Sequence, residues 1–397
     1  MQMKKCFTLC CWIGMLQLAF GQANLLESKA NLITTLSFDE LTGGIIIIRA
    51  QLDNSKDSVN FILDTGSGGV SLDSTLARFL GWELVPSDKT VKGIAGIKNV
   101  PFSYNHNIHF NNLTLEHVDM YINDYSLLTS VYGVRIDGII GFSFLRKYIF
   151  YINYDTHQIT IYTPGVYNYK GGAFLNTSFY NLPVTELVLQ DQTKIKPNFI
   201  FDIGAGLNVL VSQQYDSAYN LLDLKRKKYQ VQAEGIGGKK QMEISIIKKL
   251  QIGPYKFKNI PIHVFDDEFN VTNFPRMGGL VGNDILRRFN VVLNYPAQSI
   301  YITPNNHYYD VFDYAYTGLG IYLVEGRITI VDIVADSPGD RAGFKSGDIL
   351  FSVNKKLVNN IQDLKNILQN SIGKQQVIII REGQPLLKQL YVRDIRK

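Results

Sequence analysis

Two aspartates in this 397-residue chain occupy equivalent positions in a repeated segment. Asp64 lies in FILDTGSGGVSL and Asp202 lies in FIFDIGAGLNVL, so each follows a short apolar run and precedes a glycine-rich stretch. Aspartate and glycine are common in turns, so one such segment alone would indicate only a turn at a strand end. Two carboxyl groups in contact, however, share one proton and titrate in separate steps. One can then take a proton from water while the other donates a proton to a carbonyl oxygen, which is suitable chemistry for hydrolysing an amide.

The repeat extends well beyond the two aspartates. GIAG at residue 93 returns as GIGG at residue 235, and the segment beginning GIIGFSFLRKYIF at residue 138 returns as GLVGNDILRRFNV at residue 279. Three matches in the same order at nearly one offset predict a lobe that is present twice. Two packed lobes leave a cleft between them, and ligand sites form preferentially in such clefts.

The elements that must position these residues read mainly as strands. The apolar runs are short, rich in Ile, Val, Phe and Tyr, and separated by Gly, Asn and Asp, which favours β structure. We expect strands that include residues 44–51, 61–63, 149–154 and 159–162, and short helices over residues 144–148 and 285–289. The basic pairs at 146–147 and 287–288 are interpreted as the solvated faces of those helices.

The motif Asp64-Thr65-Gly66-Ser67, followed by the apolar-apolar-glycine element at residues 139–141, resembles the aspartic protease superfamily. Over residues 30–303 the two lobes are similar to a single-chain, retropepsin-like or pepsin-like protease. The resemblance implies a mainly β, two-lobed acid-protease fold with barrel-like lobes, in which Asp64 and Asp202 are catalytic. It implies that the catalytic loops are supported by Thr65, Gly66, Ser67 and Gly204. It also implies flaps that close over an extended peptide or protein substrate, formed by Gly93, Ile94, Gly96, Gly235, Ile236, Gly237 and Gly238.

The second lobe departs from the pattern of that family, because Ile203 and Ala205 replace the hydroxyl residues found at Thr65 and Ser67. In the family these hydroxyls lock the two loops together and hydrogen-bond the catalytic carboxylate. Without such a donor the pKa of Asp202 is expected to rise, which would make Asp202 the protonated partner of the pair. The same departure also fits an alternative, a catalytically degenerate protein that binds peptides without cutting them.

The pattern changes after residue 303, and residues 316–397 resemble a bacterial-type PDZ domain of the α+β class. The resemblance rests on the glycine-rich loop and on the segment SPGDRAGFKSGDI at residues 337–349. It implies that a strand edge accepts the C-terminal segment of a peptide, with the carboxylate bound by Gly318, Leu319, Gly320 and Ile321. The alternative is a small domain whose groove is filled by its own neighbours. Apolar spacing predicts a helix over Asn360–Gln369. The expected role of the whole PDZ domain is to hold a substrate tail or to control access to the cleft.

Residues 1–21 are interpreted as a secretory signal peptide, with a basic start, an apolar middle and a small-x-small cleavage site; an uncleaved anchor is the alternative. All three cysteines lie in this leader, so the exported chain would lack disulfides, which favours the periplasm of a Gram-negative bacterium. No later stretch predicts a membrane span. The expected domains are lobe 1 at 22–170, lobe 2 at 171–303, a linker at 304–315 and the PDZ domain at 316–397.

Other classes of function are disfavoured by the composition. The formal net charge is +5, and the charges are dispersed rather than gathered in a basic stripe, so nucleic acid is not an expected partner. The six histidines show no metal-binding pattern, and the proposed chemistry needs neither a metal nor another cofactor. The sequence therefore predicts an exported aspartic endopeptidase with a C-terminal PDZ domain.

Overall fold

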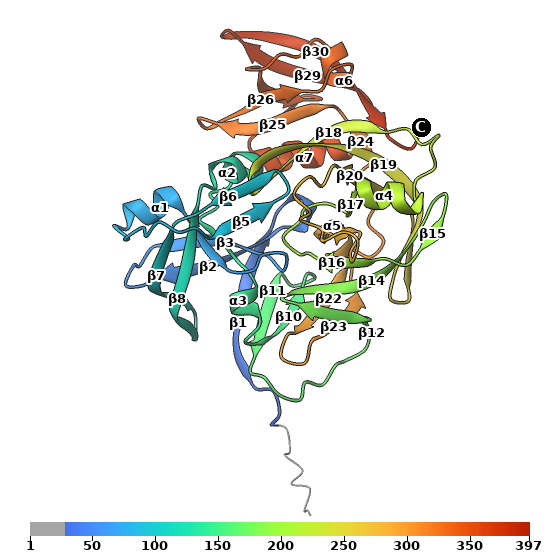
Figure 1. Ribbon diagram of the computed structural model, residues 1–397. Helices are drawn as coiled ribbons and strands as arrows, with labels where there is room; N and C mark the ends of the chain where they lie inside the picture. Colours follow the sequence, from blue (N-terminus) through green and yellow to red (C-terminus); the bar gives the residue numbers. More distant parts are fainter. Residues whose placement is uncertain (1–27) are drawn as a thin grey trace, which may run out of the picture.

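The computed structural model describes residues 28–397, so the expected signal peptide lies outside the described residues. The protein is mainly β, as expected, and two lobes carry a third domain that sits across one end of both (Figure 1). Within residues 28–397 no helix is long and apolar enough to span a bilayer.

Lobe 1 is a β structure with four short helical segments around it. Its strands are β1 (Leu32–Glu40), β2 (Ile46–Leu52), β3 (Ser58–Leu63), β4 (Val70–Asp73), β5 (Thr90–Gly93), β6 (Gly96–Asn99), β7 (Phe102–Phe110), β8 (Leu113–Asn123), β9 (Gly138–Ile140), β10 (Ile149–Asn153) and β11 (Gln158–Tyr162). Its helical segments are η1 (Thr42–Gly44), α1 (Ser74–Phe79), α2 (Ser126–Tyr132) and α3 (Phe142–Leu145).

Lobe 2 repeats this plan. Its strands are β12 (Ala173–Phe174), β13 (Thr177–Tyr180), β14 (Leu182–Gln190), β15 (Lys194–Ile195), β16 (Asn198–Phe201), β17 (Val209–Ser212), β18 (Tyr229–Gly235), β19 (Gly238–Ile252), β20 (Tyr255–Phe265), β21 (Gly279–Val281), β22 (Phe289–Asn294) and β23 (Ser299–Pro304). Its helices are α4 (Gln213–Tyr219) and α5 (Asn283–Leu286).

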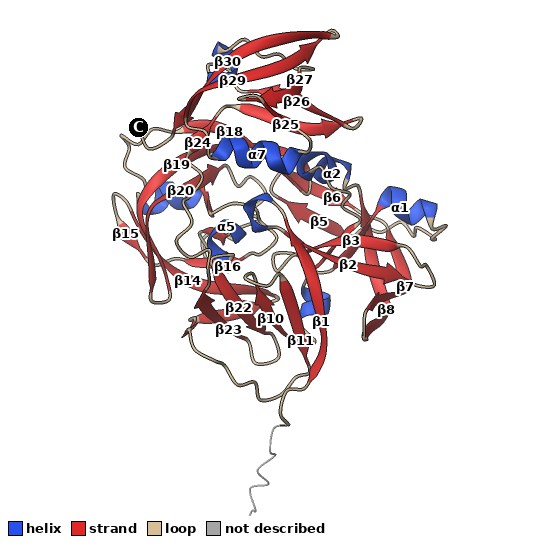
Figure 2. Cartoon of the chain, turned by 180° about the vertical axis from the view of Figure 1, so that it is seen from behind, coloured by secondary structure: helices blue, strands red, loops and turns tan. Residues whose placement is uncertain are grey.

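One continuous sheet joins the two lobes. Strand β10 of lobe 1 pairs antiparallel with β22 of lobe 2, with Tyr151 opposite Val292, and the joined strands lie at the base of the molecule (Figure 2). Tyr151 and Val292 are also equivalent positions in the repeat, 141 residues apart. A residue that pairs with its own repeat counterpart lies on the axis that relates the copies, so a pseudo-two-fold axis passes between β10 and β22.

The same strand pairings carry the Asp-x-Gly loop in each lobe. In lobe 1, β3 runs parallel to β9, and in lobe 2, β16 runs parallel to β21. The glycine that follows β9 and its counterpart after β21 lie directly beneath the loops: a Cβ on Gly141 would come within 2.3 Å of the carbonyl oxygen of Ser67, and one on Gly282 within 2.2 Å of that of Leu207. Only glycine fits there, which explains the repeated apolar-apolar-glycine element.

The short helices begin two residues earlier than the sequence predicted, because Gly141 and Gly282 already serve as their N-caps. The interpretation of the basic pairs was correct for one lobe and wrong for the other. Residues 146–147 are exposed, whereas Arg288 is fully buried. Its guanidinium donates hydrogen bonds to the backbone carbonyls of Asp284, His307 and Asp310. These bonds provide partners for a charge that burial would otherwise make costly.

Residues 304–315, expected as a linker, are packed against lobe 2. Phe312 and Tyr314 are buried and join the main core, and the Phe312 ring lies 4.0 Å from the Arg288 guanidinium carbon. Tyr314 donates a hydrogen bond to the carbonyl of Asn259 in the β19–β20 hairpin. The connection between lobe 2 and the C-terminal domain is therefore an ordered strap.

The C-terminal domain has its own sheet and its own core, which includes Ile330, Val353, Leu364, Ile379 and Val392. Its strands are β24 (Ala315–Tyr316), β25 (Leu319–Val324), β26 (Arg327–Ile333), β27 (Ile349–Val353), β28 (Lys356–Leu357), β29 (Gly373–Arg381) and β30 (Gln384–Asp394). Its helices are α6 (Pro338–Arg341) and α7 (Ile361–Gln369). Helix α7 was predicted one residue longer, because Asn360 is its N-cap.

Candidate active site

Asp64 and Asp202 meet at the interface between the lobes. The two carboxyl groups lie close enough that each shifts the pKa of the other. Each also accepts a hydrogen bond from the backbone two residues ahead: the Gly66 N–H lies 2.7 Å from Asp64 Oδ1, and the Gly204 N–H lies 2.9 Å from Asp202 Oδ1. The structure thus brings together the two aspartates that the repeat identified, with nearly the same loop around each.

The glycines of the two motifs make this approach possible. A Cβ on Gly66 would lie 2.5 Å from Asp202 Oδ2, and a Cβ on Gly204 would lie 2.4 Å from Asp64 Oδ1. Any side chain at either position would therefore collide with the opposite carboxyl group. The Asp-x-Gly spacing is required by the contact between the loops as well as by the turn that each loop makes.

Thr65 joins the two loops across the axis. Its hydroxyl donates to the carbonyl oxygen of Phe201 at 2.6 Å and accepts from the N–H of Ile203 at 2.9 Å. Thr65 is fully buried, so these bonds are shielded from water. Ile203 contributes no reciprocal bond, and its side chain is buried in the main hydrophobic core instead. One threonine therefore links the two loops, and apolar packing holds the other side.

Ser67 does not place its hydroxyl on the catalytic carboxylate, as the resemblance implied. Its Oγ lies 3.0 Å from the hydroxyl of Tyr121, and only its backbone N–H is directed at Asp64. The backbone N–H of Ala205 makes the corresponding contact with Asp202. Because the backbone supplies these donors, the missing hydroxyl at Ala205 removes no bond that Ser67 makes to its own aspartate.

Burial raises the pKa of both aspartates, and the shift is larger for Asp202. At Asp202 burial is reinforced by the negative charge of Asp64, so its pKa lies well above the ordinary value for an aspartate. At Asp64 burial also raises the pKa, but hydrogen bonds from Gly66, Asp202 and Ser67 oppose the shift. The direction at Asp202 is the one expected from the sequence, although burial rather than a lost hydroxyl is its main cause.

Two hairpins cover this pair, and their tips touch. Strands β5 and β6 form the lobe 1 hairpin, and strands β18 and β19 form the lobe 2 hairpin. A Cβ on Gly93 would lie 1.9 Å from the carbonyl oxygen of Ile236, and one on Gly237 would lie 2.4 Å from the backbone nitrogen of Gly96. The predicted flap residues on the two hairpins are thus in direct backbone contact.

Each tip also packs against the opposite lobe. Ile94 of the lobe 1 hairpin contacts a lobe 2 cluster that includes Ile200 and Leu280. Ile236 of the lobe 2 hairpin contacts a lobe 1 cluster that includes Ile47 and Ile62. The hairpins therefore cross, and together they cover the dyad.

Comparison with known families identifies the class of both lobes and of the C-terminal domain. Residues 48–144 and 187–285 each match the aspartyl protease family, and residues 329–382 match the PDZ domain family. The two lobes are aspartyl protease domains. No curated protein matches the chain. The comparison confirms the resemblance inferred from the sequence, including the duplication and the C-terminal PDZ domain.

The sequence analysis missed one residue near the two aspartates, Tyr132 at the end of α2. Burial raises its pKa, and the negative charges of Glu234, Asp64 and Asp202 raise it further. This tyrosine thus lies within electrostatic reach of both carboxyl groups and of the lobe 2 hairpin. It belongs to a segment with no counterpart in the repeat pattern, so the repeat could not point to it.

The glycine-rich loop of the PDZ domain begins β25, which forms an edge of the domain's main sheet. Gly318 has φ +70°, and a Cβ there would meet Ser337. The N–H of Leu319 already donates to the hydroxyl of Thr317 at 3.2 Å, and Ile321 belongs to the domain core. The four predicted residues therefore form the start of a strand, and lobe 1 helix α2 lies against that strand.

Proposed function

We propose that this chain is an aspartic endopeptidase in which Asp64 and Asp202 activate water to hydrolyse peptide bonds. The observation that carries the proposal is the pair of aspartates at the lobe interface, where Gly66 lies against the carboxyl group of Asp202 and Gly204 against that of Asp64. Burial raises the pKa of both groups. A shared proton gives one general base and one general acid in contact. Aspartyl protease domains in both lobes support the same class of chemistry.

The asymmetry of the pair assigns the starting roles. Charged Asp64 takes a proton from the attacking water, and protonated Asp202 donates a proton to the carbonyl oxygen of the scissile bond. Water then adds to the carbonyl carbon and gives a tetrahedral diol, and transfer of a proton to the amide nitrogen releases the two products. Thr65 keeps the loops in register during these steps through its bonds to Phe201 and Ile203.

The substrate in this proposal is an extended peptide or an unfolded segment of a protein. It would lie beneath the crossed hairpins and pair with their strands through its backbone, while apolar pockets accept alternate side chains. Because the hairpin tips touch in this structure, at least one hairpin must move to admit such a chain.

Export to the periplasm is part of the proposal and rests on the leader at residues 1–21. The PDZ domain has two candidate roles, which are holding a peptide terminus and controlling access to the cleft. Its contacts with the lobe 2 hairpin favour control of access.

Hydrolysis of a mixed peptide library between pH 3 and 8 tests the catalytic proposal. The experiment compares the parent with Asp64→Asn and Asp202→Asn, and uses Asp88→Asn, an exposed aspartate of lobe 1, as the matched control. We expect each dyad variant to lose at least about 100-fold in rate, because general acid–base groups contribute about 10²–10⁴-fold. The control should retain the parent rate. A parent that binds peptides but cuts none at any pH would instead identify a peptide-binding protein.

A further inference from the structure

The lobe 2 hairpin is attached to the PDZ domain by a cluster of polar side chains. Gln232 on β18 donates from its Nε2 to the Tyr322 hydroxyl at 2.7 Å and to Asp332 Oδ2 at 2.9 Å. The Tyr322 hydroxyl in turn donates to Glu234 on the same strand. Lys239, next to the hairpin tip on β19, pairs with Asp332. The attachment thus reaches from the middle of the hairpin almost to its tip.

Lys239 and Asp332 form an ion pair within this cluster. Burial alone would raise the pKa of Asp332, but hydrogen bonds from Lys239 and Gln232 outweigh it and hold the pKa below its ordinary value. The Lys239 ammonium also lies 4.9 Å from the centre of the Tyr322 ring. Tyr322 itself is only 3% exposed, so its hydroxyl depends on the hairpin for hydrogen-bond partners.

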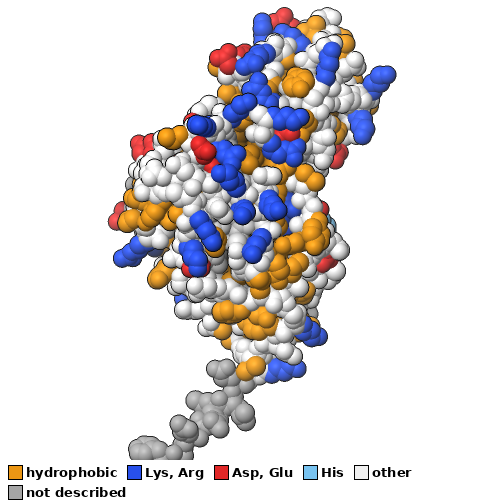
Figure 3. Space-filling view, turned by 90° about the vertical axis from the view of Figure 1, so that its right-hand side faces the viewer, with side chains coloured by type: hydrophobic (Ala, Val, Ile, Leu, Met, Phe, Trp, Pro, Cys, Tyr) orange, Lys and Arg blue, Asp and Glu red, His pale blue; other side chains and the backbone are white. Residues whose placement is uncertain are grey.

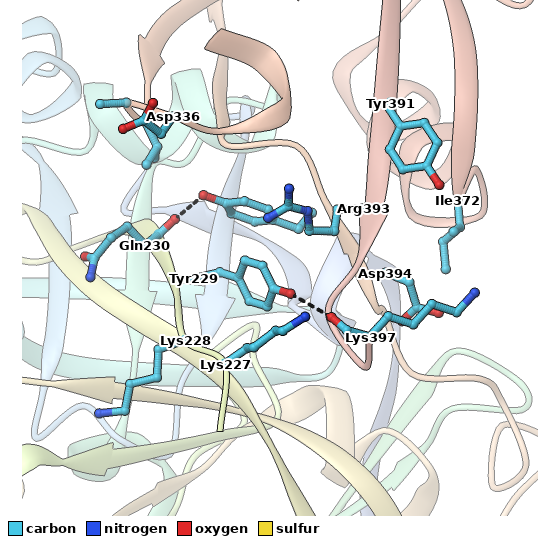
Figure 4. Close-up of a pocket in the computed structure, with 13 residues that line it drawn as sticks. Lys227, Lys228, Tyr229, Gln230, Asp336, Ile372, Tyr391, Arg393, Asp394 and Lys397 are labelled. Atoms are coloured by element: carbon cyan, nitrogen blue, oxygen red, sulfur yellow. Dashed lines mark hydrogen bonds between the residues drawn. The ribbon is translucent and has the colours of Figure 1, made fainter. Parts of the chain in front are cut away.

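The stem of the hairpin is attached at two further points. Tyr229 donates to the carbonyl of Lys397 at 3.1 Å, and Tyr316 donates to the carbonyl of Gln230 at 2.9 Å, as Figure 4 shows. A hollow of about 650 Å³ opens beside these bonds, on a face where lysine and arginine side chains gather near the junction of lobe 2 and the PDZ domain (Figure 3). The stem of the hairpin is therefore held by these hydrogen bonds together with the packing of the Tyr229 ring against the Tyr316 ring, whose centroids lie 5.1 Å apart.

The PDZ domain also holds the part of lobe 1 that carries Tyr132. Gln362 and Lys365 of α7 donate to the carbonyls of Tyr132 and Val131 at 2.6 and 2.8 Å. Gln362 further accepts from the backbone and hydroxyl of Thr42. Helix α2 lies against both β25 and α7. A segment of lobe 1 therefore packs against a strand and a helix of the PDZ domain.

We propose that Tyr322 and Asp332 of the PDZ domain are positioning residues for the protease reaction, because they hold the lobe 2 hairpin over Asp64 and Asp202. This inference rests on the proposed endopeptidase activity. The PDZ domain then acts as a fixed support for the active-site cover, and its main partner is the hairpin of its own chain. Neither residue touches the reacting atoms; each acts through Gln232, Glu234 or Lys239.

A charge exchange across the pair tests the inference. Asp332→Lys and Lys239→Asp each place like charges together, whereas the double variant restores an opposite pair. Tyr322→Phe removes only the hydroxyl. Glu382→Gln, in the exposed turn between β29 and β30, serves as the control within the same domain. The full-length protein is used throughout.

The first readout is backbone hydrogen exchange of residues 230–240. Partly exposed ion pairs and their hydrogen bonds contribute about 1 kcal/mol, so each single variant should exchange about fivefold faster in this segment. The double variant should return to within about twofold of the parent. Strand β22, in the sheet between the lobes, should keep its protection in every variant, which separates local release of the hairpin from loss of the fold.

The second readout is steady-state peptide hydrolysis. We expect kcat to fall about fivefold in the single variants with KM within about twofold of the parent, because the hairpin orients bound substrate for attack. The charge-exchanged protein should recover kcat. Unchanged exchange in the single variants, or no recovery in the double variant, would overturn the inference while leaving the activity of the parent intact. A parent that cuts no peptide would overturn the positioning role together with the proposed function, and the exchange data would then report only on the attachment.

Discussion

Lobe 1 and lobe 2 derive from one pattern but have been adapted to different tasks. Lobe 1 keeps the hydroxyl that joins the catalytic loops, in Thr65, and its hairpin is short, with four residues in each strand. Lobe 2 has Ile203 at the equivalent position, and its hairpin is long, with strands of seven and fifteen residues. That long hairpin is the one that contacts the PDZ domain. The comparison indicates that one copy retained the loop chemistry while the other acquired the attachments to the third domain.

The equivalent basic pairs show the same division. In lobe 1 the pair at residues 146–147 is exposed, whereas in lobe 2 Arg288 is buried and binds the strap at residues 304–315. A basic position that faces solvent in lobe 1 thus supports an interdomain connection in lobe 2.

The largest difference between the lobes is expected at Arg288 and its counterpart in the repeat, Lys147. Arg288→Met should lower the free energy of unfolding by about 3–5 kcal/mol, because it removes the hydrogen bonds that the buried guanidinium donates to the carbonyls of Asp284, His307 and Asp310. Lys147→Met should change the same quantity by no more than about 0.5 kcal/mol, as is usual at exposed sites. Urea denaturation of both variants measures the difference. Equal effects would mean that the lobes are not specialised in this way.

A second, smaller difference is expected at the catalytic loops. Thr65→Val should lower the free energy of unfolding by about 2–4 kcal/mol, since the Phe201 carbonyl and the Ile203 N–H would both lose their buried partner. Ile203→Val, which removes one methyl group and leaves those bonds intact, should cost only about 1 kcal/mol. Denaturation curves of the two variants, with peptide hydrolysis measured in parallel, make the comparison. A larger loss at position 203 would show that packing, not the threonine, holds the loops.

The smallest effect is a pH dependence of stability that should differ between the two aspartates. The folded state raises the pKa of Asp202, so ionisation of this group opposes folding, and the parent loses stability as the pH rises above its ordinary value of about 3.8. Asp202→Asn cannot ionise and should therefore raise the melting temperature at pH 7.5, with the gain shrinking toward pH 4. Asp64→Asn should give a smaller gain. The measurement is thermal melting across this pH range. A larger gain in melting temperature for Asp64→Asn than for Asp202→Asn would contradict the larger rise in pKa at Asp202.

Features that occur in both copies of the repeat could be predicted from the sequence. The offset between the copies was sufficient to predict the duplicated lobe, the two aspartates and both hairpins, because each of these is set by local residues such as Gly66 and Gly204 that appear twice. The PDZ fold was likewise indicated by a contiguous segment.

Features that depend on contacts between distant segments could not be predicted from the sequence. Arg288 occupies the same position in the repeat as the exposed Lys147, and nothing in its neighbourhood along the chain indicates that residues 304–315 will cover it. Tyr132 approaches the catalytic carboxyl groups only because α7, some 230 residues away in the chain, holds the end of α2. The hydroxyl of Ser67 turned to Tyr121 rather than to Asp64 for the same kind of reason.

The pairing of Tyr151 with Val292 on the pseudo-two-fold axis has a consequence for how such a protein evolves. In a symmetric homodimer every substitution appears on both sides of the axis, so a change that impairs one catalytic loop also impairs the other. In this chain the residues on the two sides of the axis are separate sequence positions, so a substitution changes only one side. A single chain can therefore carry Ile203 and Ala205 in one loop while Thr65 and Ser67 remain in the other.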